Sequence, residues 1–310
     1  MYFPYLRGRQ YELLALRELL SEGLISKDFI RPIIEPIKET STFLKTVESF
    51  VEKEYPIYTI INPQVGEYEV HQKNHPILKE EFKNKNDAVM MNDKDFKRYL
   101  PFLKNSQDFI TIYCSRDDLK KNEEIRSMDL QPSVNFIEDS TRFKRNFTIN
   151  RQPIGMIRDA FNRRNRNVDY LDKQEEFFSD DHLFYKEEGY MAFSDYSVIG
   201  SFFAEGGFAP IAVAIHIVYF DDNNTLRIRH FVSETNDDIS NPAGKFQEAL
   251  QKLVQWSEKI DKKNDSKGLN EFRRLLENKQ YPGLGVAKKL SIMHHLEIMD
   301  RFLRDGNRSE

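Results

Sequence analysis

Residues 1–20 read MYFPYLRGRQYELLALRELL, and this stretch decides the expected fold class. A short apolar run, Tyr2–Leu6, meets a polar corner that contains Gly8. Leucines then recur at helical spacing from Leu13 to Leu20, which predicts a helix. The stretch is therefore a strand that enters a helix with almost no connecting loop, and the same unit recurs along the chain.

Eight such strands are predicted. They are Tyr2–Leu6, Pro32–Ile37, Ile57–Ile61, Ala88–Met91, Phe109–Cys114, Val134–Ile137, Ile154–Ile157 and Tyr190–Phe193. Helices are predicted at Tyr11–Leu20, Ser41–Glu54, Asp93–Lys104 and Asp117–Ser127, and further ones at His75–Lys83, after Asp139 and at Lys173–Phe184. We expect Ser41 to be an N-cap, because a serine hydroxyl can accept from the first free backbone amides of a helix.

This alternation predicts right-handed βαβ units and a parallel sheet. Many of the strands are nearly continuous apolar runs, as expected when both faces of a sheet are covered. Eight strands favour closure into an α/β fold of the (β/α)8 barrel type. The alternative is an open doubly wound α/β sheet, although the chain has neither a G-x-G-x-x-G nor a Walker A sequence.

The pattern changes after Tyr196. Two apolar segments, 209–220 and 225–234, flank the turn-forming sequence DDNN and predict a β-hairpin. With residues 221–224 as the turn, His216 is expected on one face and His230 on the other. Three helices should follow, at Ala243–Lys259, Gly268–Glu277 and Val286–Leu303.

The expected domains are therefore a barrel-like core over residues 1–200 and an elaboration over 201–310, in which the hairpin and helices pack on the core.

Composition indicates a cytoplasmic protein. The chain has 310 residues, of which 39% are hydrophobic and 31% charged, with a net charge of −4. The longest apolar stretch, Phe208–Phe220, is interrupted by His216 and is too short to span a bilayer, so no membrane partner is expected. The first residues predict a strand rather than an export signal. Cys114 stands alone, which is typical of a reducing compartment, and is interpreted as a small core residue.

The charge is segregated along the chain. Residues 142–166 carry eight Lys and Arg against one acid, whereas residues 169–188 carry eight Asp and Glu against two lysines. A basic block favours phosphate or nucleic-acid binding. The alternative is that the two blocks neutralise each other on one solvated surface.

In parallel α/β folds the functional residues lie just beyond the C-terminal ends of the strands. Two carboxylates at such positions, Glu35 and Asp195, are the candidate catalytic bases. The candidate ligand-binding residues at these corners are Arg7, Gln10, Lys38, Asn62 and Tyr196. Glu35 stands out because it follows two isoleucines, where a carboxylate is costly without a partner or a function. Pairing of Glu35 with Arg7 or Lys38 is the structural alternative.

A second candidate region is rich in arginine. Arg163, Arg164 and Arg166 are followed by Asp169 and Tyr170, and the guanidinium groups could hold phosphate while aromatic rings stack on a base. This loop could equally clamp the acidic segment that follows it. We predict no metal site, because the histidines lack zinc-like spacing and the pair Glu138-Asp139 has no phosphate-binding glycines near it. The cofactor stays undetermined.

Several motifs together resemble a known family. They are YFPYLRGRQ (2–10), IEPIK (34–38), RNVDY (166–170), FSDDH (178–182), FSDY (193–196) and HF (230–231). The chain is similar over nearly its whole length to an uncharacterised bacterial group related to the phage-and-bacterial "beta protein" family. The resemblance implies a TIM-barrel-like fold and a place in defence-associated loci, beside a partner protein of nuclease type. It implies no catalytic residue.

Three functions follow as hypotheses. The first is a component of a two-gene anti-phage defence module that binds a nucleotide, a nucleic acid or its nuclease-type partner. The second is a barrel hydrolase that acts on a phosphoester or nucleotide, with Glu35 or Asp195 as base. The third is a non-catalytic interaction scaffold. The oligomeric state, including a homo-oligomer, stays open.

Overall fold

The computed structural model describes residues 1–67, 86–92, 96–115, 118–138, 140–204, 206 and 210–307. The chain forms two compact units, each made of three segments. The first unit contains residues 1–13, 26–159 and 181–196, and the second contains residues 14–25, 160–180 and 197–310. The domains expected from the sequence, 1–200 and 201–310, are continuous ranges, whereas each unit of the structure combines three separate segments of the chain.

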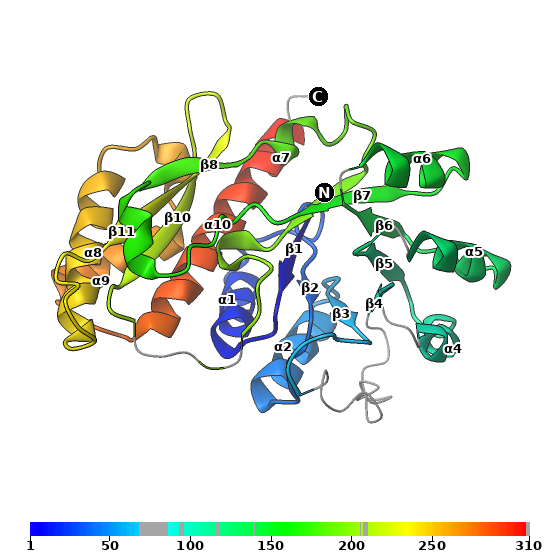
Figure 1. The fold of residues 1–310 in the computed structure, drawn as a ribbon, viewed down its shortest axis with the longest axis horizontal. Helices are drawn as coiled ribbons and strands as arrows, with labels where there is room; N and C mark the ends of the chain where they lie inside the picture. Colours follow the sequence, from blue (N-terminus) through cyan, green and yellow to red (C-terminus); the bar gives the residue numbers. More distant parts are fainter. Residues whose placement is uncertain are drawn as a thin grey trace. The chain divides into compact units, whose positions relative to one another are not determined.

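The first unit is a closed barrel of eight parallel strands, which confirms the expected (β/α)8 class (Figure 1). In barrel order they are β1 (Tyr2–Leu6), β2 (Ile33–Ile34), β3 (Tyr58–Ile60), β4 (Asn86–Met90), β5 (Phe109–Tyr113), β6 (Val134–Ile137), β7 (Ile154–Arg158) and β9 (Ala192–Asp195). β9 pairs with both β7 and β1, which closes the barrel. All eight predicted strands are present, with ends that differ by a few residues.

Helices connect these strands. They are α1 (Gln10–Ser21), α2 (Ser41–Glu52), the 3-10 turn η2 (Phe96–Tyr99) with α4 (Leu100–Leu103), α5 (Leu119–Ser127) and α6 (Thr141–Ile149). The N-cap of α2 is Thr40 rather than the predicted Ser41, because the Thr40 hydroxyl accepts from the Phe43 amide. The predicted helix 75–83 and the starts of the helices predicted at 93 and 117 lie outside the described residues.

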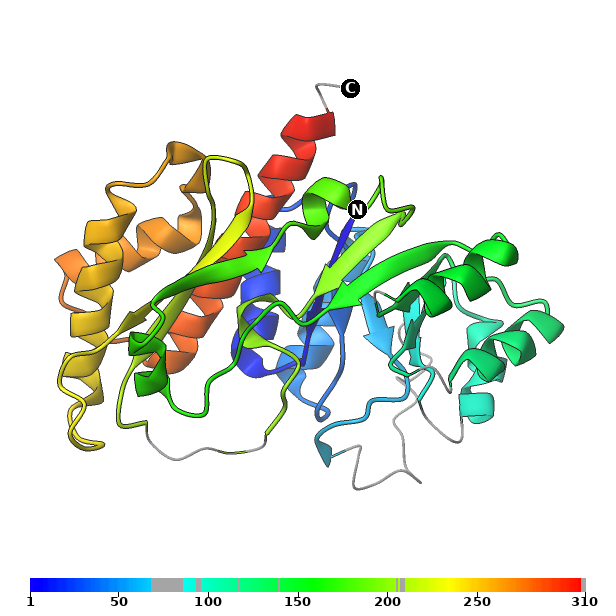
Figure 2. The ribbon, with the colours of Figure 1, turned by 45° about the horizontal axis from the view of Figure 1, so that its top comes forward.

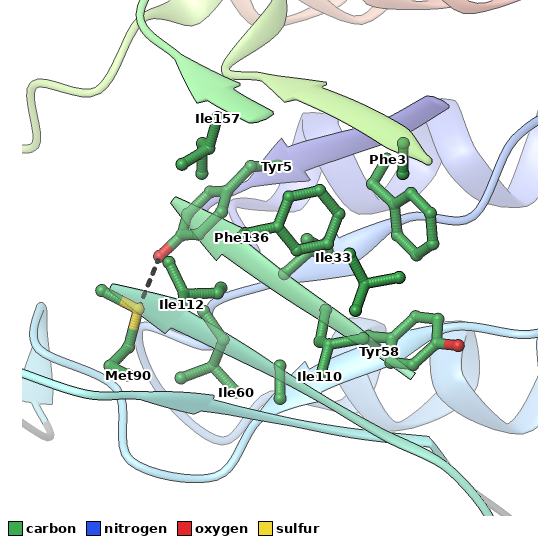
Figure 3. Packing of buried hydrophobic residues seen from close by; sticks show 13 residues of the cluster. Phe3, Tyr5, Ile33, Tyr58, Ile60, Met90, Ile110, Ile112, Phe136 and Ile157 are labelled. Carbon is green, nitrogen blue, oxygen red and sulfur yellow. Dashed lines mark hydrogen bonds between the residues drawn. The ribbon is translucent and has the colours of Figure 1, made fainter. Parts of the chain in front are cut away.

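Alternate residues of the strands fill the barrel interior (Figure 3). The rings of Phe3 and Phe136 meet edge to face, with their centroids 5.0 Å apart. Gly155 on β7 makes room for Phe136, since a Cβ at this position would lie 2.6 Å from the Phe136 ring. The alternation that buries Phe3 and Tyr5 also directs the residues after the strand ends, such as Arg7 and Glu35, toward the barrel axis.

The second unit is built on an antiparallel sheet in the order β10–β11–β8. Its strands are β8 (Glu175–Ser179), β10 (Ala214–Phe220) and β11 (Leu226–Val232), and its helices are α8 (Pro242–Ser257), α9 (Lys267–Glu277) and α10 (Leu284–Asn307). Short 3-10 turns are η4 (Asn167–Leu171), η5 (Ser197–Ile199) and η6 (Lys262–Asn264). The C-terminal helices agree closely with their predicted ranges.

Helices cover both faces of this sheet (Figures 1 and 2). Tyr219 and Phe231 pack against Trp256 of α8, with ring centroids 4.9 and 5.2 Å from the indole. On the opposite face Phe220 stacks on Phe302 of α10 at 4.8 Å. The hairpin is therefore the central layer of an α/β/α unit.

The predicted helix Lys173–Phe184 is wrong over most of its length. Residues 175–179 form β8, and only α7 (Asp181–Phe184) is helical. β8 pairs antiparallel with β11, and Glu175 forms ion pairs with Arg227 and Arg229 across the strands. These partners lie some fifty residues away in sequence, so the local pattern Glu-Glu-Phe-Phe did not reveal the strand.

The predicted hairpin register is also wrong by one residue. His216 pairs directly with His230, so both lie on the same face of the sheet. The Asp221 amide donates to the Thr225 carbonyl, which leaves a three-residue loop with Asn224 in the left-handed region (φ 60°). The expected turn of four residues had put the two histidines on opposite faces. A one-residue change of register moves every side chain to the other side.

Candidate functional site

Glu35 lies directly after β2, where its side chain is fully buried. Its Oε2 accepts a 2.7 Å hydrogen bond from the Tyr5 hydroxyl and forms an ion pair with Arg7. Its Oε1 accepts from the backbone amide of Gln64 at 2.7 Å. Both oxygens of this carboxylate are therefore occupied by structural donors, as a buried charge requires.

Arg7 is almost as enclosed, with 12% of its side chain exposed. Its guanidinium carbon lies 5.1 Å from the centroid of the Tyr5 ring and 5.5 Å from that of Tyr196. Burial raises the pKa of both tyrosine hydroxyls, so they stay protonated at neutral pH. Gly8, with φ of 63°, turns the chain here, and a Cβ on it would lie 3.1 Å from the Glu35 carbonyl oxygen.

The other residues predicted in the barrel do not join this group. Ala192 and Ser194 face the barrel interior, so the next residue, Asp195, points to the other face of β9. Its carboxylate accepts a 2.7 Å hydrogen bond from the Tyr2 hydroxyl. Both polar atoms of the Asn62 side chain are bonded to the backbone of Met90 on β4. Oδ1 accepts from the Met90 amide and Nδ2 donates to the Met90 carbonyl, both at 2.8 Å. Gln10 and Lys38 are exposed. The structure thus brings Arg7, Glu35 and Tyr196 together and leaves Asp195 apart.

Cys114 follows β5 and is partly buried. Burial and the nearby Asp118 and Glu138 carboxylates raise the pKa of its thiol to about 12. The thiol is protonated at neutral pH, which agrees with its interpretation as a small packing residue and not as a nucleophile.

The second unit contains a cavity of about 310 Å³. Cationic side chains of the predicted arginine-rich loop, Arg163 and Arg164, line it together with Lys288 of α10. Other parts of its wall are apolar and include Phe161, Ile199 and Ile215. One cavity therefore offers both positive charge and an apolar surface.

Only part of the predicted loop reaches this cavity. Tyr170 lines it, whereas Arg166 and Asp169 pair with each other, with Nη2 of Arg166 2.9 Å from Oδ1 of Asp169. Hydrogen bonds from Arg166 hold the pKa of the Asp169 carboxyl below its usual value. This pair caps the N-terminus of η4 and does not line the cavity.

The two arginines of the cavity have different surroundings. Arg164 is ion-paired with Glu176, Nη2 to Oε2, at 3.1 Å. Arg163 is exposed and lies over the ring of Phe202, with its guanidinium carbon 3.7 Å from the centroid. Within the described parts of the chain no carboxylate pairs with Arg163. The acidic block thus neutralises part of the basic block through Arg164 and Arg166.

Three side chains form a hydrogen-bonded chain that starts at the cavity wall. Nδ1 of His216, which lines the cavity, is 2.7 Å from Nδ1 of His230. Nε2 of His230 is 3.3 Å from Oε1 of the buried Glu176. Oε2 of Glu176 in turn accepts from Asn162, Arg164 and Lys173 at 3.1–3.3 Å. We call this arrangement the Glu176–His230–His216 chain.

Burial keeps both histidines neutral at pH 7. It lowers the pKa of His216 well below the usual value, and a second proton on His230 and the charge of Lys288 act in the same direction. Burial also lowers the pKa of His230, although Glu176 opposes this. Tyr170 packs against both imidazoles, with centroids 4.7 and 4.4 Å from its own, and thereby fixes them in place.

Sequence reasoning missed all three members of this chain. Glu176 fell in a segment predicted as helix, and the assumed turn separated the histidines. His230 is a buried residue that is hydrogen-bonded to Glu176. A three-residue loop between Asp221 and Thr225, with Asn224 in the left-handed region, is the signal that could have paired His216 with His230.

His294 and His295 are both buried, and they face different partners. His294 contacts the Ser266 hydroxyl and the Val218 carbonyl oxygen, whereas His295 contacts the Ser197 hydroxyl. Among the residues that the structure describes, no three His, Cys, Asp or Glu side chains are grouped so that they could hold a metal ion. Asp139 of the predicted acidic pair lies outside those residues.

The helices in the described ranges include none that is both long and apolar enough to cross a membrane. A scan against protein-family models found no match, and searches of curated proteins and of solved structures found none either.

Proposed function

We propose that the protein binds a phosphate-bearing ligand of nucleotide size in the cavity of the second unit. The observation that carries this proposal is the position of Arg163, a cavity-lining cation with no carboxylate partner in the described residues. Guanidinium groups bind phosphate through paired hydrogen bonds. Lys288 adds a second positive charge to the same wall.

The apolar part of the wall supports a nucleotide over free phosphate. A volume of about 310 Å³ lies at the small end of ligand-binding cavities. Phe161, Ile199 and Ile215 offer a surface on which a base or sugar can be buried. We expect adenosine 5′-monophosphate to bind more tightly than inorganic phosphate, since only the nucleotide uses both parts of the wall.

Calorimetric titration of the whole protein with adenosine 5′-monophosphate tests this proposal. The double variant Arg163→Ala/Lys288→Ala should weaken binding roughly 100-fold, because it removes two charged contacts. Arg166→Ala is the matched control, since Arg166 is also exposed but pairs with Asp169 outside the cavity, and it should bind as the wild type does. Equal affinity in the double variant and the wild type would refute the proposal.

A single-stranded oligonucleotide provides the other arm of this test. If it binds much more tightly than the mononucleotide and with a steep salt dependence, the ligand is a nucleic acid. If the two bind alike, the cavity recognises one terminal nucleotide. Loss of binding in the double variant is expected in both cases, since the same cations hold the phosphate.

We propose separately that the protein belongs to a two-gene anti-phage defence module with a nuclease-type partner. This proposal rests on the resemblance of the motifs around Arg7, Glu35 and Tyr170. Phage plating on cells that carry both genes, either gene alone or neither tests it. Protection only when both genes are present is expected, and equal plaque counts in all four strains would refute it.

A further inference from the structure

The Glu176–His230–His216 chain has a defined arrangement of protons. Oε2 of Glu176 is surrounded by three donors, two of them cationic. An ionised carboxylate accepts hydrogen bonds, so the Nε2 of His230 that faces it must carry a proton. A neutral imidazole holds one proton, and the Nδ1 of His230 is therefore an acceptor.

The proton positions on His230 also determine those on His216. Because its Nδ1 is 2.7 Å from the acceptor Nδ1 of His230, it must be the donor of that hydrogen bond. The Nε2 of His216 is then unprotonated and carries a lone pair. The opposite tautomers would direct a lone pair of His230 at the Glu176 carboxylate, which is repulsive. Glu176 thus determines, through His230, that His216 offers a basic nitrogen.

The position of His216 at the cavity wall makes its Nε2 a candidate base for a bound ligand. His216 lines the same cavity as Arg163 and Lys288 and is partly exposed, whereas His230 and Glu176 are buried behind it. A base that is oriented by a second group, itself held by a third, is an arrangement that recurs in acid–base catalysis. A ligand phosphate at the two cations would lie within the cavity that His216 lines.

We propose that the cavity hydrolyses phosphodiesters of nucleotide size, with His216 as the general base. The proposal rests on the proposed function, since the same cations hold the substrate. His230 and Glu176 are positioning residues that fix the tautomer of His216. Arg163 and Lys288 stabilise the charge that develops on the phosphate oxygens.

The reaction balances with water as the only co-reactant. The Nε2 of His216 takes a proton from a water molecule, and the water oxygen bonds to phosphorus. The bond between phosphorus and the ester oxygen breaks, and that oxygen receives the proton that His216 holds. The products are a phosphomonoester and an alcohol, and His216 returns to its neutral tautomer.

The pH dependence follows from the groups around His216. Burial, His230 on β11 and Lys288 on α10 disfavour a proton on His216, Arg164 on the loop disfavours one on His230, and the hydroxyl of Tyr170 accepts from the Arg164 amide. The acid limb of kcat/KM should therefore lie below the ordinary histidine range, with a flat rate through neutrality. His230→Gln should shift this limb, which a purely structural role would not do.

The test uses the p-nitrophenyl ester of thymidine 5′-phosphate, with the release of nitrophenolate as readout. This leaving group needs no proton, so the assay isolates the role of the base. His216→Gln should lower kcat roughly 100-fold or more while KM changes little. The control Arg166→Ala should turn over as the wild type does. Turnover of His216→Gln at the wild-type rate would overturn the proposal.

Calorimetric binding of thymidine 5′-phosphate, measured on the same samples, separates this proposal from the proposed function. If the wild type binds the nucleotide but releases nitrophenolate no faster than buffer does, the catalytic proposal fails and the binding proposal stands. If the wild type neither binds nor hydrolyses, both fail. Binding by His216→Gln with loss of turnover is the expected result.

Discussion

At the scale of single residues, the structure changes the interpretation of Glu35. The sequence made it a candidate base because a carboxylate beside isoleucines needs a partner or a function. Tyr5, Arg7 and Gln64 supply partners for both of its oxygens. Removal of one member of a buried ion pair leaves the other uncompensated, which is usually more damaging than loss of an exposed pair.

Glu35→Gln should therefore lower the free energy of unfolding by about 3 kcal/mol, because Arg7 loses its countercharge inside the barrel end. Urea denaturation measures this change. Lys38→Gln serves as the control, since Lys38 is exposed, and should shift stability by less than about 0.5 kcal/mol. Wild-type stability in Glu35→Gln would show that the ion pair contributes nothing.

Gly155 gives a second prediction at this scale. An alanine there would place Cβ 2.6 Å from the ring of Phe136, so the barrel core must shift. Gly155→Ala should cost about 1–3 kcal/mol in the same measurement. Gly306→Ala is the matched control, because nothing lies within 4 Å of a Cβ at that position in α10, and helix propensity should make it neutral or slightly stabilising. Equal effects of the two variants would contradict this account.

At the scale of elements, the hairpin β10–β11 brings the two histidines of the candidate site together. Its three-residue loop sets the register that pairs His216 with His230. The side chain of Asp221 accepts from the amides of Asn223 and Thr225, both at 2.9 Å, and Asn224 adopts a φ of 60°. Asparagine tolerates this left-handed conformation better than other residues with a side chain.

Asn224→Ala should thus destabilise the protein by about 1 kcal/mol, whereas Asn224→Gly should stay close to the wild type. Thermal unfolding compares the two variants. If alanine and glycine behave alike at this position, the backbone conformation of the loop does not hold the register.

At the scale of the whole molecule, stability should depend on the buried histidines of the second unit. Burial lowers the pKa of His294 to about 4 and that of His295 to about 3. The unfolded chain binds these protons near the ordinary pKa of 6.5, while the folded chain does not. Since the unfolded state then holds more protons, the free energy of unfolding must fall as the pH drops below about 6.5.

Each of the two histidines should lower the free energy of unfolding by up to about 1.4 kcal/mol per pH unit in the acid range. Urea denaturation at several pH values between neutrality and the pKa of His294 measures the slope. His295→Asn keeps a partner for Ser197 without a titrating group and should reduce the slope by the contribution of one histidine. An unchanged slope would mean that His295 is not neutral in the folded protein.

The barrel could be predicted from sequence because its signals are local. Each strand and the helix after it lie within about thirty residues, so apolar runs and helical spacing reveal them one at a time. Arg7 and Glu35 could be proposed as neighbours because consecutive parallel strands end at the same side of the barrel. Asp195 failed to join them because one residue along a strand reverses the direction of a side chain.

Local sequence patterns are enough to favour the eightfold barrel and to predict the arginine-rich loop and the helices near the C-terminus. The Glu176–His230–His216 chain becomes apparent only in the folded protein. Glu176 joins it through β8, which pairs with a strand some fifty residues away, and His216 joins it through the register of one loop. Such contacts depend on non-local pairing and on the conformation of single residues, which apolar periodicity does not encode.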